Sequence, residues 1–202
     1  MLWRSSICED WQLAPQLRRI SLGGNQRAQV KASVFVGTSL DGFIARPNGA
    51  LDFLDAGGGE PHGYDEFMAS VDALVIGRHT FDTVLGFGGW AYGKKPVFVL
   101  STRSLPPVPA GAVVERMTGD PVAIVEQLEA RGIRHAYVDG GITIQGFLKA
   151  GLIQRLIITR VPVLIGAGIP LFGSLLHDIP LRHVATRHYR TGLVQSEYEV
   201  AA

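Results

Sequence analysis

Glycine, hydroxyl and arginine residues follow three apolar runs of the sequence at the points where those runs stop. The segments are Gly77-Arg78-His79-Thr80, Ser101-Thr102-Arg103 and Asp139-Gly140-Gly141. The first backbone N–H groups of a helix have no partner within the helix and favour an anion, and a guanidinium can form a bidentate pair with a phosphate. Glycine lets a phosphate approach the backbone closely. These segments are therefore candidates for binding a ligand that carries phosphates.

Each segment taken alone has a simpler explanation. Gly77-Arg78 also fits an ordinary glycine turn with a surface arginine. The double glycine lacks the G-x-G-x-x-G spacing of the common dinucleotide-binding fold, so that fold is not indicated. Three strand ends of the same kind nevertheless favour one extended ligand, and the two arginines, Arg78 and Arg103, suit an additional 2′-phosphate.

The elements that must position these segments alternate along the chain. Continuous apolar runs predict strands at 30–37, 73–77, 96–101, 135–139 and 152–165, the last of them bent or broken around Pro162. Apolar residues at helical spacing predict helices at 64–71, 120–132 and 143–151. In the second helix we expect Asp120 as the N-cap and Val122, Val125 and Leu128 facing the core.

The order of these elements predicts the fold class. Strands alternate with helices, a further short strand is expected within 106–116, and residues 181–200 form a hairpin pattern with its turn at Thr191-Gly192. We therefore predict a three-layer α/β/α domain around a mostly parallel central sheet with a C-terminal antiparallel hairpin. Ligands of such sheets bind at the carboxyl ends of the strands.

Composition restricts the classes of partner and the location. The 202 residues carry a formal net charge of +1 with no long basic run, which argues against a nucleic-acid partner. No uncharged apolar run reaches the length of about 18 residues that a membrane span needs. A single cysteine, Cys8, excludes an intramolecular disulfide and fits a reducing compartment, so we expect a cytoplasmic protein.

The first 29 residues differ from the rest of the chain. They show no clear periodicity and lack the apolar core of a secretory signal. We interpret residues 1–29 as an extension that is disordered or that precedes the true start, and residues 30–202 as one domain. The later histidines, His177, His183 and His188, lack the spacing of metal ligands, so we predict no metal site. The glycine-rich segment around Trp90 and Tyr92 fits either a mobile flap or a dimer contact.

Residues 30–200 resemble the dihydrofolate reductase superfamily, and most closely the reductase domain of the bifunctional deaminase–reductase of riboflavin synthesis. Five segments carry the resemblance in order: TSLDGFIA, VIGRHTFD, LSTR, VDGGITIQGFL and VPVLIGAGIPLFG. The resemblance implies a dihydrofolate reductase-like fold, NADPH as hydride donor, a small heterocyclic or imine-type substrate such as a pterin or pyrimidine, and a homodimer. The reduction of 5-amino-6-(5-phosphoribosylamino)uracil and another dihydrofolate reductase-like activity both stay open. The alternative is a non-catalytic regulatory protein of the same fold that binds NADP(H).

The resemblance also implies which residues hold the cofactor. Gly37 and Ile44 match positions that border the nicotinamide. The segment from Gly77, with Arg78, His79 and Thr80, would bind phosphates, and Ser101, Thr102 and Arg103 would flank the 2′-phosphate. The pyrophosphate would lie on Gly140, Gly141, Ile142 and Thr143, with a cis peptide between the two glycines.

Hydride transfer to a C=N bond leaves charge on nitrogen, so the reaction needs a source of protons. The acidic candidates are Asp139, Asp41 and Asp65. Asp139 ends a strand beside the double glycine, where the riboflavin-type reductases also carry an acidic residue. Asp41 fits equally well as a residue that orders its loop, and Asp65 as one that favours a helix start.

Two departures from the related families bear on the substrate. Gly63 stands where dihydrofolate reductases place a pterin-binding acid, which weakens folate as the substrate. Phe43 stands where the riboflavin reductases commonly carry a basic residue, which places a phosphorylated pyrimidine in doubt.

Overall fold

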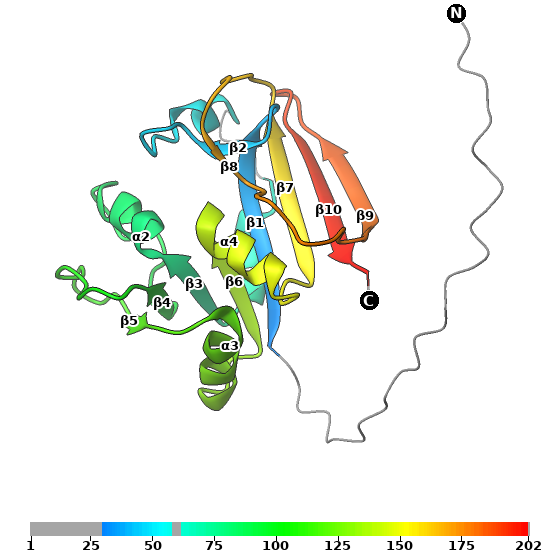
Figure 1. Cartoon of the computed structure of the whole chain (residues 1–202). Helices are drawn as coiled ribbons and strands as arrows, with labels where there is room; N and C mark the ends of the chain where they lie inside the picture. The colour runs from blue at the N-terminus through cyan, green and yellow to red at the C-terminus, as the bar shows by residue number, and fades with distance from the viewer. Residues whose placement is uncertain (1–29, 58–61, 202) are drawn as a thin grey trace, which may run out of the picture.

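The computed structural model describes residues 30–57 and 62–201, so the expectations for residues 1–29 lie outside the described part. Within that part an eight-stranded sheet has the order β5-β4-β3-β6-β1-β7-β10-β9 (Figure 1). Its strands are β1 (Lys31–Ser39), β3 (Ala73–Gly77), β4 (Val97–Leu100), β5 (Val114–Met117), β6 (His135–Asp139), β7 (Arg155–Val161), β9 (Leu181–His188) and β10 (Val194–Val200). A separate antiparallel pair joins β2 (Phe43–Ala45) to β8 (Ile169–Pro170).

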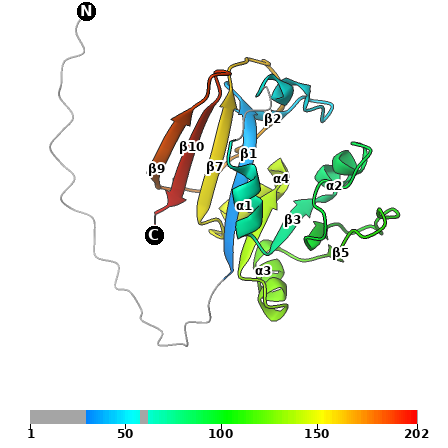
Figure 2. The same ribbon diagram turned by 180° about the vertical axis from the view of Figure 1, so that it is seen from behind.

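The predicted fold class is confirmed by the pairing of the strands and the layers of helices. The pairs from β5 to β7 are all parallel, whereas β10 runs antiparallel to β7 and β9. Helices α3 (Pro121–Ala130) and α4 (Gly141–Lys149) cover one face of the sheet. Helix α1 (Tyr64–Ser70) covers the other face of the sheet (Figure 2). The hydrophobic core on that face also includes side chains of α2 (Arg78–Leu85). A 3₁₀ helix, η1 (Asp52–Gly57), follows β2.

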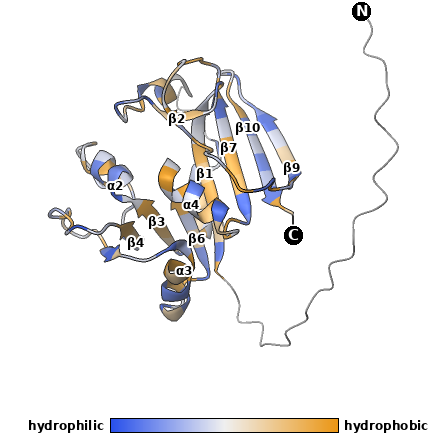
Figure 3. Cartoon of the chain, viewed as in Figure 1, coloured by the Kyte–Doolittle hydropathy of each residue, from blue (hydrophilic) through white to orange (hydrophobic). Residues whose placement is uncertain are grey.

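The apolar runs lie where helices cover both faces of the sheet. In β3 the run from Ala73 to Ile76 is fully buried, as expected for a central parallel strand. Strand β9 is largely exposed, and Figure 3 shows hydrophilic residues on β9 and β10 in contrast to the central strands. None of the helices in the described ranges combines the length and the hydropathy needed to span a bilayer.

Local signals set most of the element boundaries. The carboxylate of Asp120 accepts a hydrogen bond from the Ala123 N–H at 2.9 Å and so caps α3, as predicted. Strand β7 ends directly before Pro162, which cannot donate to the sheet. The inward orientation expected for Val122 is wrong, because this side chain is 51% exposed. The buried stripe of α3 runs through Ile124, Val125 and Leu128, and Val122 lies outside it.

The two glycine turns after β3 and β6 interlock. A Cβ atom at Gly77 would lie 2.8 Å from Oγ1 of Thr143, on α4. A Cβ atom at Gly140 would collide with Oγ1 of Thr80, on α2. Glycine therefore ends β3 and directly follows β6, because the threonine of the neighbouring strand-to-helix turn occupies the space of a side chain.

The cis peptide expected between Gly140 and Gly141 is wrong, since no peptide bond in the described residues is cis. The chain turns at Gly140 with φ at 93° instead. Residues with a side chain rarely adopt this region, and glycine adopts it without steric cost. The sharp turn that places α4 against β6 is thus provided by the backbone freedom of one glycine.

We expect the two glycines to respond differently to alanine. Gly77 has φ at −74°, so Gly77→Ala should cost only the contact with Thr143, about 1–3 kcal/mol of the free energy of unfolding. Thr143→Ala in the same chain should recover much of that loss. Gly140→Ala also forces a strained backbone, so Thr80→Ala should recover little. Denaturant unfolding of the single and double variants measures both cycles, and simple additivity at the Gly77 pair would contradict the interlock.

Candidate active site

A cavity of about 610 Å³ lies at the carboxyl ends of β1, β3 and β6. It gathers most of the candidate residues from distant parts of the sequence: Gly37, Ile44, Gly77, Arg78, His79, Thr80, Asp139, Gly140, Gly141, Ile142 and Thr143. A second cavity of about 340 Å³ is lined by Arg78, Ser101, Thr102 and Arg103. The two cavities adjoin, because both include Arg78, Leu100 and Gly119 in their walls. The strand order thus brings all three candidate segments together.

Two helix N-termini contribute to the larger cavity. The N-cap residues are Gly77 for α2 and Gly140 for α4, and neither can supply a side-chain cap. The first turns of both helices also lack acidic residues. Unpaired N–H groups and the positive ends of two helix dipoles therefore line the cavity, and both features favour a negatively charged ligand.

The guanidinium groups of the two arginines of the site differ in their hydrogen bonds. Nε of Arg78 donates to the Asp82 carboxylate at 2.8 Å, and its Nη1 donates to the Ser104 carbonyl oxygen at 2.9 Å. These bonds hold Arg78 in the wall between the two cavities. In residues 30–57 and 62–201 no hydrogen bond or ion pair engages the guanidinium of Arg103, which leaves all its donors for a ligand. The hydroxyl of Ser101 is used within its own turn, where it bonds both backbone groups of Arg103.

Among the described residues that line the larger cavity, Asp139 is the one with a carboxyl group. Burial raises its pKa, although a hydrogen bond from the Gly140 N–H at 2.7 Å acts in the opposite direction. The neighbouring Tyr137 hydroxyl donates its proton to the carbonyl oxygen of Phe35 at 2.7 Å. The Asp139 carboxyl therefore keeps its proton to a higher pH than a carboxyl in water, as a general acid requires.

Two further tyrosines are influenced by the charge of this carboxyl. Burial, with the charge of Asp139 as a second cause, raises the pKa of Tyr64 to about 12 and raises the pKa of Tyr92 further. Tyr92 is buried and lines the cavity, and its ring contacts Trp90 edge-on with centroids 5.3 Å apart. This packing makes Tyr92 part of the cavity wall, whereas the sequence left a flap and a dimer contact open.

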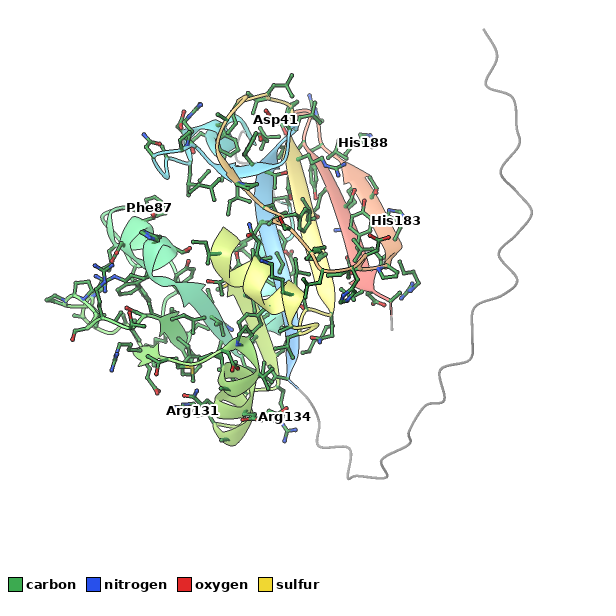
Figure 4. The ribbon with its side chains drawn as sticks, viewed as in Figure 1. Asp41, Phe87, Arg131, Arg134, His183 and His188 are labelled. Carbon is green, nitrogen blue, oxygen red and sulfur yellow. The ribbon has the colours of Figure 1, made fainter. Side chains whose placement is uncertain are left out.

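The other two acidic candidates lie outside the lining of both cavities. Asp41 accepts hydrogen bonds from the N–H groups of Ile165 at 3.3 Å and Gly166 at 2.8 Å, in the loop after β7 (Figure 4). Its pKa is lowered chiefly by a hydrogen bond with Ser39, so it is a loop-ordering carboxylate. Asp65 is exposed in the first turn of α1. The structure thus brings only Asp139 to the cavity.

The remaining residues singled out in the sequence also lie away from the cavity. Phe43 pairs with Pro170 in the small sheet and packs against Gly168. A Cβ atom added at Gly168 would lie 2.9 Å from the Cβ atom of Phe43. Gly63 precedes α1. His183 and His188 lie on β9, on the opposite side of the ribbon from Phe87 (Figure 4). No group of three His, Cys, Asp or Glu residues in the described part could hold a metal ion.

Sequence reasoning missed several residues of the cavity wall. Tyr137 could have been found, because it precedes Asp139 by two residues and so lies on the same face of β6. Leu51 and Leu54 come from the segment around η1, and Phe87 follows α2. These three positions carry no periodic pattern that would indicate a binding wall.

Comparison with known proteins agrees with this geometry. The family model of the RibD C-terminal domain matches residues 31–195. YwjB of Bacillus subtilis (strain 168) is 30% identical over 162 residues, which cover 79% of this chain and 92% of YwjB. A solved structure from Shewanella sp. PV-4, of a protein provisionally assigned to riboflavin biosynthesis, shares 40% identity with a TM-score of 0.78 and covers 86% of this chain and 100% of that one.

A more distant structure shows how far the fold extends. Dihydrofolate reductase from Enterococcus faecalis, solved in complex with NADP(H), has 16% identity and a TM-score of 0.56, with 86% of this chain and 98% of that one covered. At this identity the likeness concerns the fold alone. Sheet order, cavity position and the match over most of the domain lead to the same conclusion: the chain belongs to the RibD C-terminal domain family and has the dihydrofolate reductase-like fold.

Proposed function

We propose that this protein is an NADPH-dependent reductase that transfers a hydride to a small heterocyclic or imine-type substrate. The observation that supports it most is the convergence of two uncapped helix N-termini and an unengaged arginine on two adjoining cavities. A dinucleotide with an extra 2′-phosphate has its negative charges spread over a similar succession of sites. When bound, NADPH supplies the hydride.

Different residues of the chain would bind different parts of the cofactor. The N–H groups at the start of α4, from Gly141 to Thr143, would bind the pyrophosphate, and those at the start of α2 would add to them. Arg103 and Thr102 would bind the 2′-phosphate in the smaller cavity. Gly37 and Ile44, in the larger cavity, would border the nicotinamide. Arg78 would bind phosphate in the orientation that Asp82 gives it.

Asp139 would supply or relay the proton in this proposal. Its raised pKa favours the protonated form, and its position in the cavity wall places it next to the space left for a substrate. The Tyr137 hydroxyl would fix the carboxyl while its own proton is directed to the Phe35 carbonyl. The apolar surroundings would exclude water from the reacting atoms.

Binding and turnover test the proposal together. NADPH affinity should be measured by calorimetry, and NADPH oxidation followed at 340 nm with pterins, dihydrofolate and ribosylaminopyrimidines. We expect binding of NADPH and oxidation with at least one of these substrates. Binding without turnover on any of them would favour a non-catalytic NADP(H)-binding protein, and absence of NADPH binding would contradict both.

Arg103→Ala should weaken the binding of NADPH more than the binding of NADH. The lost bonds to the 2′-phosphate are charge-assisted, so the binding of NADPH should weaken by roughly 1.5–3 kcal/mol and that of NADH much less. Arg78→Ala should also weaken the binding of NADPH. Arg187→Ala, in the exposed strand β9, is the matched control and should change neither affinity. An equal loss for the two cofactors in the Arg103 variant would show that this residue does not bind the 2′-phosphate.

Asp139→Asn should change both kcat and the dependence of stability on pH. We expect kcat to fall roughly 100-fold or more. The wild-type rate should decline as the pH rises through the raised pKa of Asp139, and the rate of the variant should not show this decline. The ionised carboxylate is disfavoured in the folded state, so stability is lost as pH rises through that pKa. The variant should therefore gain unfolding free energy over the wild type at pH 8 and lose this gain below pH 3.8.

Asp65→Asn, on the exposed side of α1, serves as the control for both measurements. A wild-type pH profile in the Asp139 variant would remove Asp139 as the proton source. A homodimer and a cytoplasmic location stay predictions from the sequence.

A further inference from the structure

The wall of the larger cavity is divided into two chemically different halves. Helix starts with backbone N–H groups, Arg78 and His79 form one half. The other half comes from the end of β1, from β2 and from the segment through η1. It consists of Phe35, Val36, Gly37, Ile44, Ala45, Gly49, Leu51 and Leu54, none of which has a charged or hydrogen-bonding side chain.

The charged residues next to this apolar half neutralise each other outside it. Arg46 directly follows Ala45, and Asp52 directly follows Leu51. The Arg46 guanidinium donates two bonds to the Asp52 carboxylate, at 2.6 and 2.8 Å. Hydrogen bonding and the charge of Asp52 raise the pKa of Arg46, which keeps the pair ionised. The cation nearest in sequence to the apolar half is therefore engaged elsewhere.

The cavity is rich in aromatic rings. Phe35, Tyr92 and Tyr137 line it, and Phe87, which Figure 4 shows between α2 and the β2–η1 segment, lines it while being 61% exposed. Rings of this kind bind planar apolar surfaces. Asp139 is the one carboxyl among the described lining residues and can bond a single ring N–H or ring nitrogen.

We propose that the substrate is an uncharged planar nitrogen heterocycle that carries neither a phosphate nor a carboxylate. This inference rests on the proposed function, because it assigns the phosphate-binding half of the cavity to NADPH. An anionic group against the apolar half would lose its hydration without gaining a charged or hydrogen-bonding side chain from the residues that form that half. A neutral ring would bury its faces against the aromatic side chains and present one polar edge to Asp139.

Calorimetry with matched ligands on the NADP⁺-saturated protein tests the proposal. One pair is 7,8-dihydropterin and dihydrofolate, which share the pterin ring but differ in the p-aminobenzoylglutamate group, which carries two carboxylates. The other is 5-amino-6-ribosylaminouracil with and without its 5′-phosphate. We expect the neutral member of at least one pair to bind at least tenfold more tightly than its anionic partner.

A cation placed on the apolar half should reverse this preference. Leu51→Lys adds an ammonium at a partly exposed position of the wall, and should narrow or invert the ratio of affinities within the pair. Leu176→Lys makes the same change at a side chain that is 93% exposed and outside both cavities, and should leave the ratio unchanged. Unchanged NADP⁺ affinity shows that both variants are folded.

Tighter or equal binding of the anionic members by the wild type would overturn the inference. Binding of no neutral member, while NADP⁺ still binds, would overturn it as well and leave the reductase proposal standing. Failure of the wild-type protein to bind NADP⁺ would instead contradict the proposed function.

Discussion

The contact between two strand-to-helix turns is the constraint on which the site depends. Strands β3 and β6 are neighbours. Gly77 ends β3 and Gly140 directly follows β6, and the threonine of the other turn packs against each glycine. Because Thr143 fills the space at Gly77 and Thr80 fills that at Gly140, the two turns cannot move independently. The N-termini of α2 and α4 are consequently fixed side by side. Two sets of open N–H groups then face one cavity.

The distribution of charge around the cavity follows from this arrangement. Uncapped helix N-termini concentrate positive potential at one half of the wall, while the residues of the segment from β2 to η1 that line the cavity are apolar. Asp139 lies between these halves, at the end of β6. Burial rather than a charged neighbour sets its pKa, so its chemistry depends on the packing of the tyrosines around it.

The membership in the RibD C-terminal domain family is compatible with a different substrate from that of its relatives. A shared fold preserves the edge of the sheet where Gly77 and Gly140 lie, because that edge is built from strand ends and helix starts. The opposite half of the cavity comes largely from the short strand β2 and the connecting segment through η1. Connections of this kind change more readily than the sheet, and specificity changes with them.

The sequence by itself determined the order of elements and the edge of the sheet at which the cavities lie. Apolar runs, the Asp120 cap and Pro162 act within a few residues, and a parallel sheet collects Gly77, Arg103 and Gly140 at one edge whatever the details of packing.

Only the tertiary structure decided the finer points of the site. It paired Arg78 with Asp82, left the Arg103 guanidinium without a bond to any described residue, moved Asp41 to the loop at Gly166, kept the Gly140–Gly141 peptide trans and placed Asp139 in the cavity wall with Tyr92 and Tyr137. These outcomes depend on contacts between residues far apart in the sequence, and the loop residues Leu51 and Leu54 have no periodicity to reveal them. A local pattern records which residues a strand or helix needs, but not which distant side chain will occupy the space beside it.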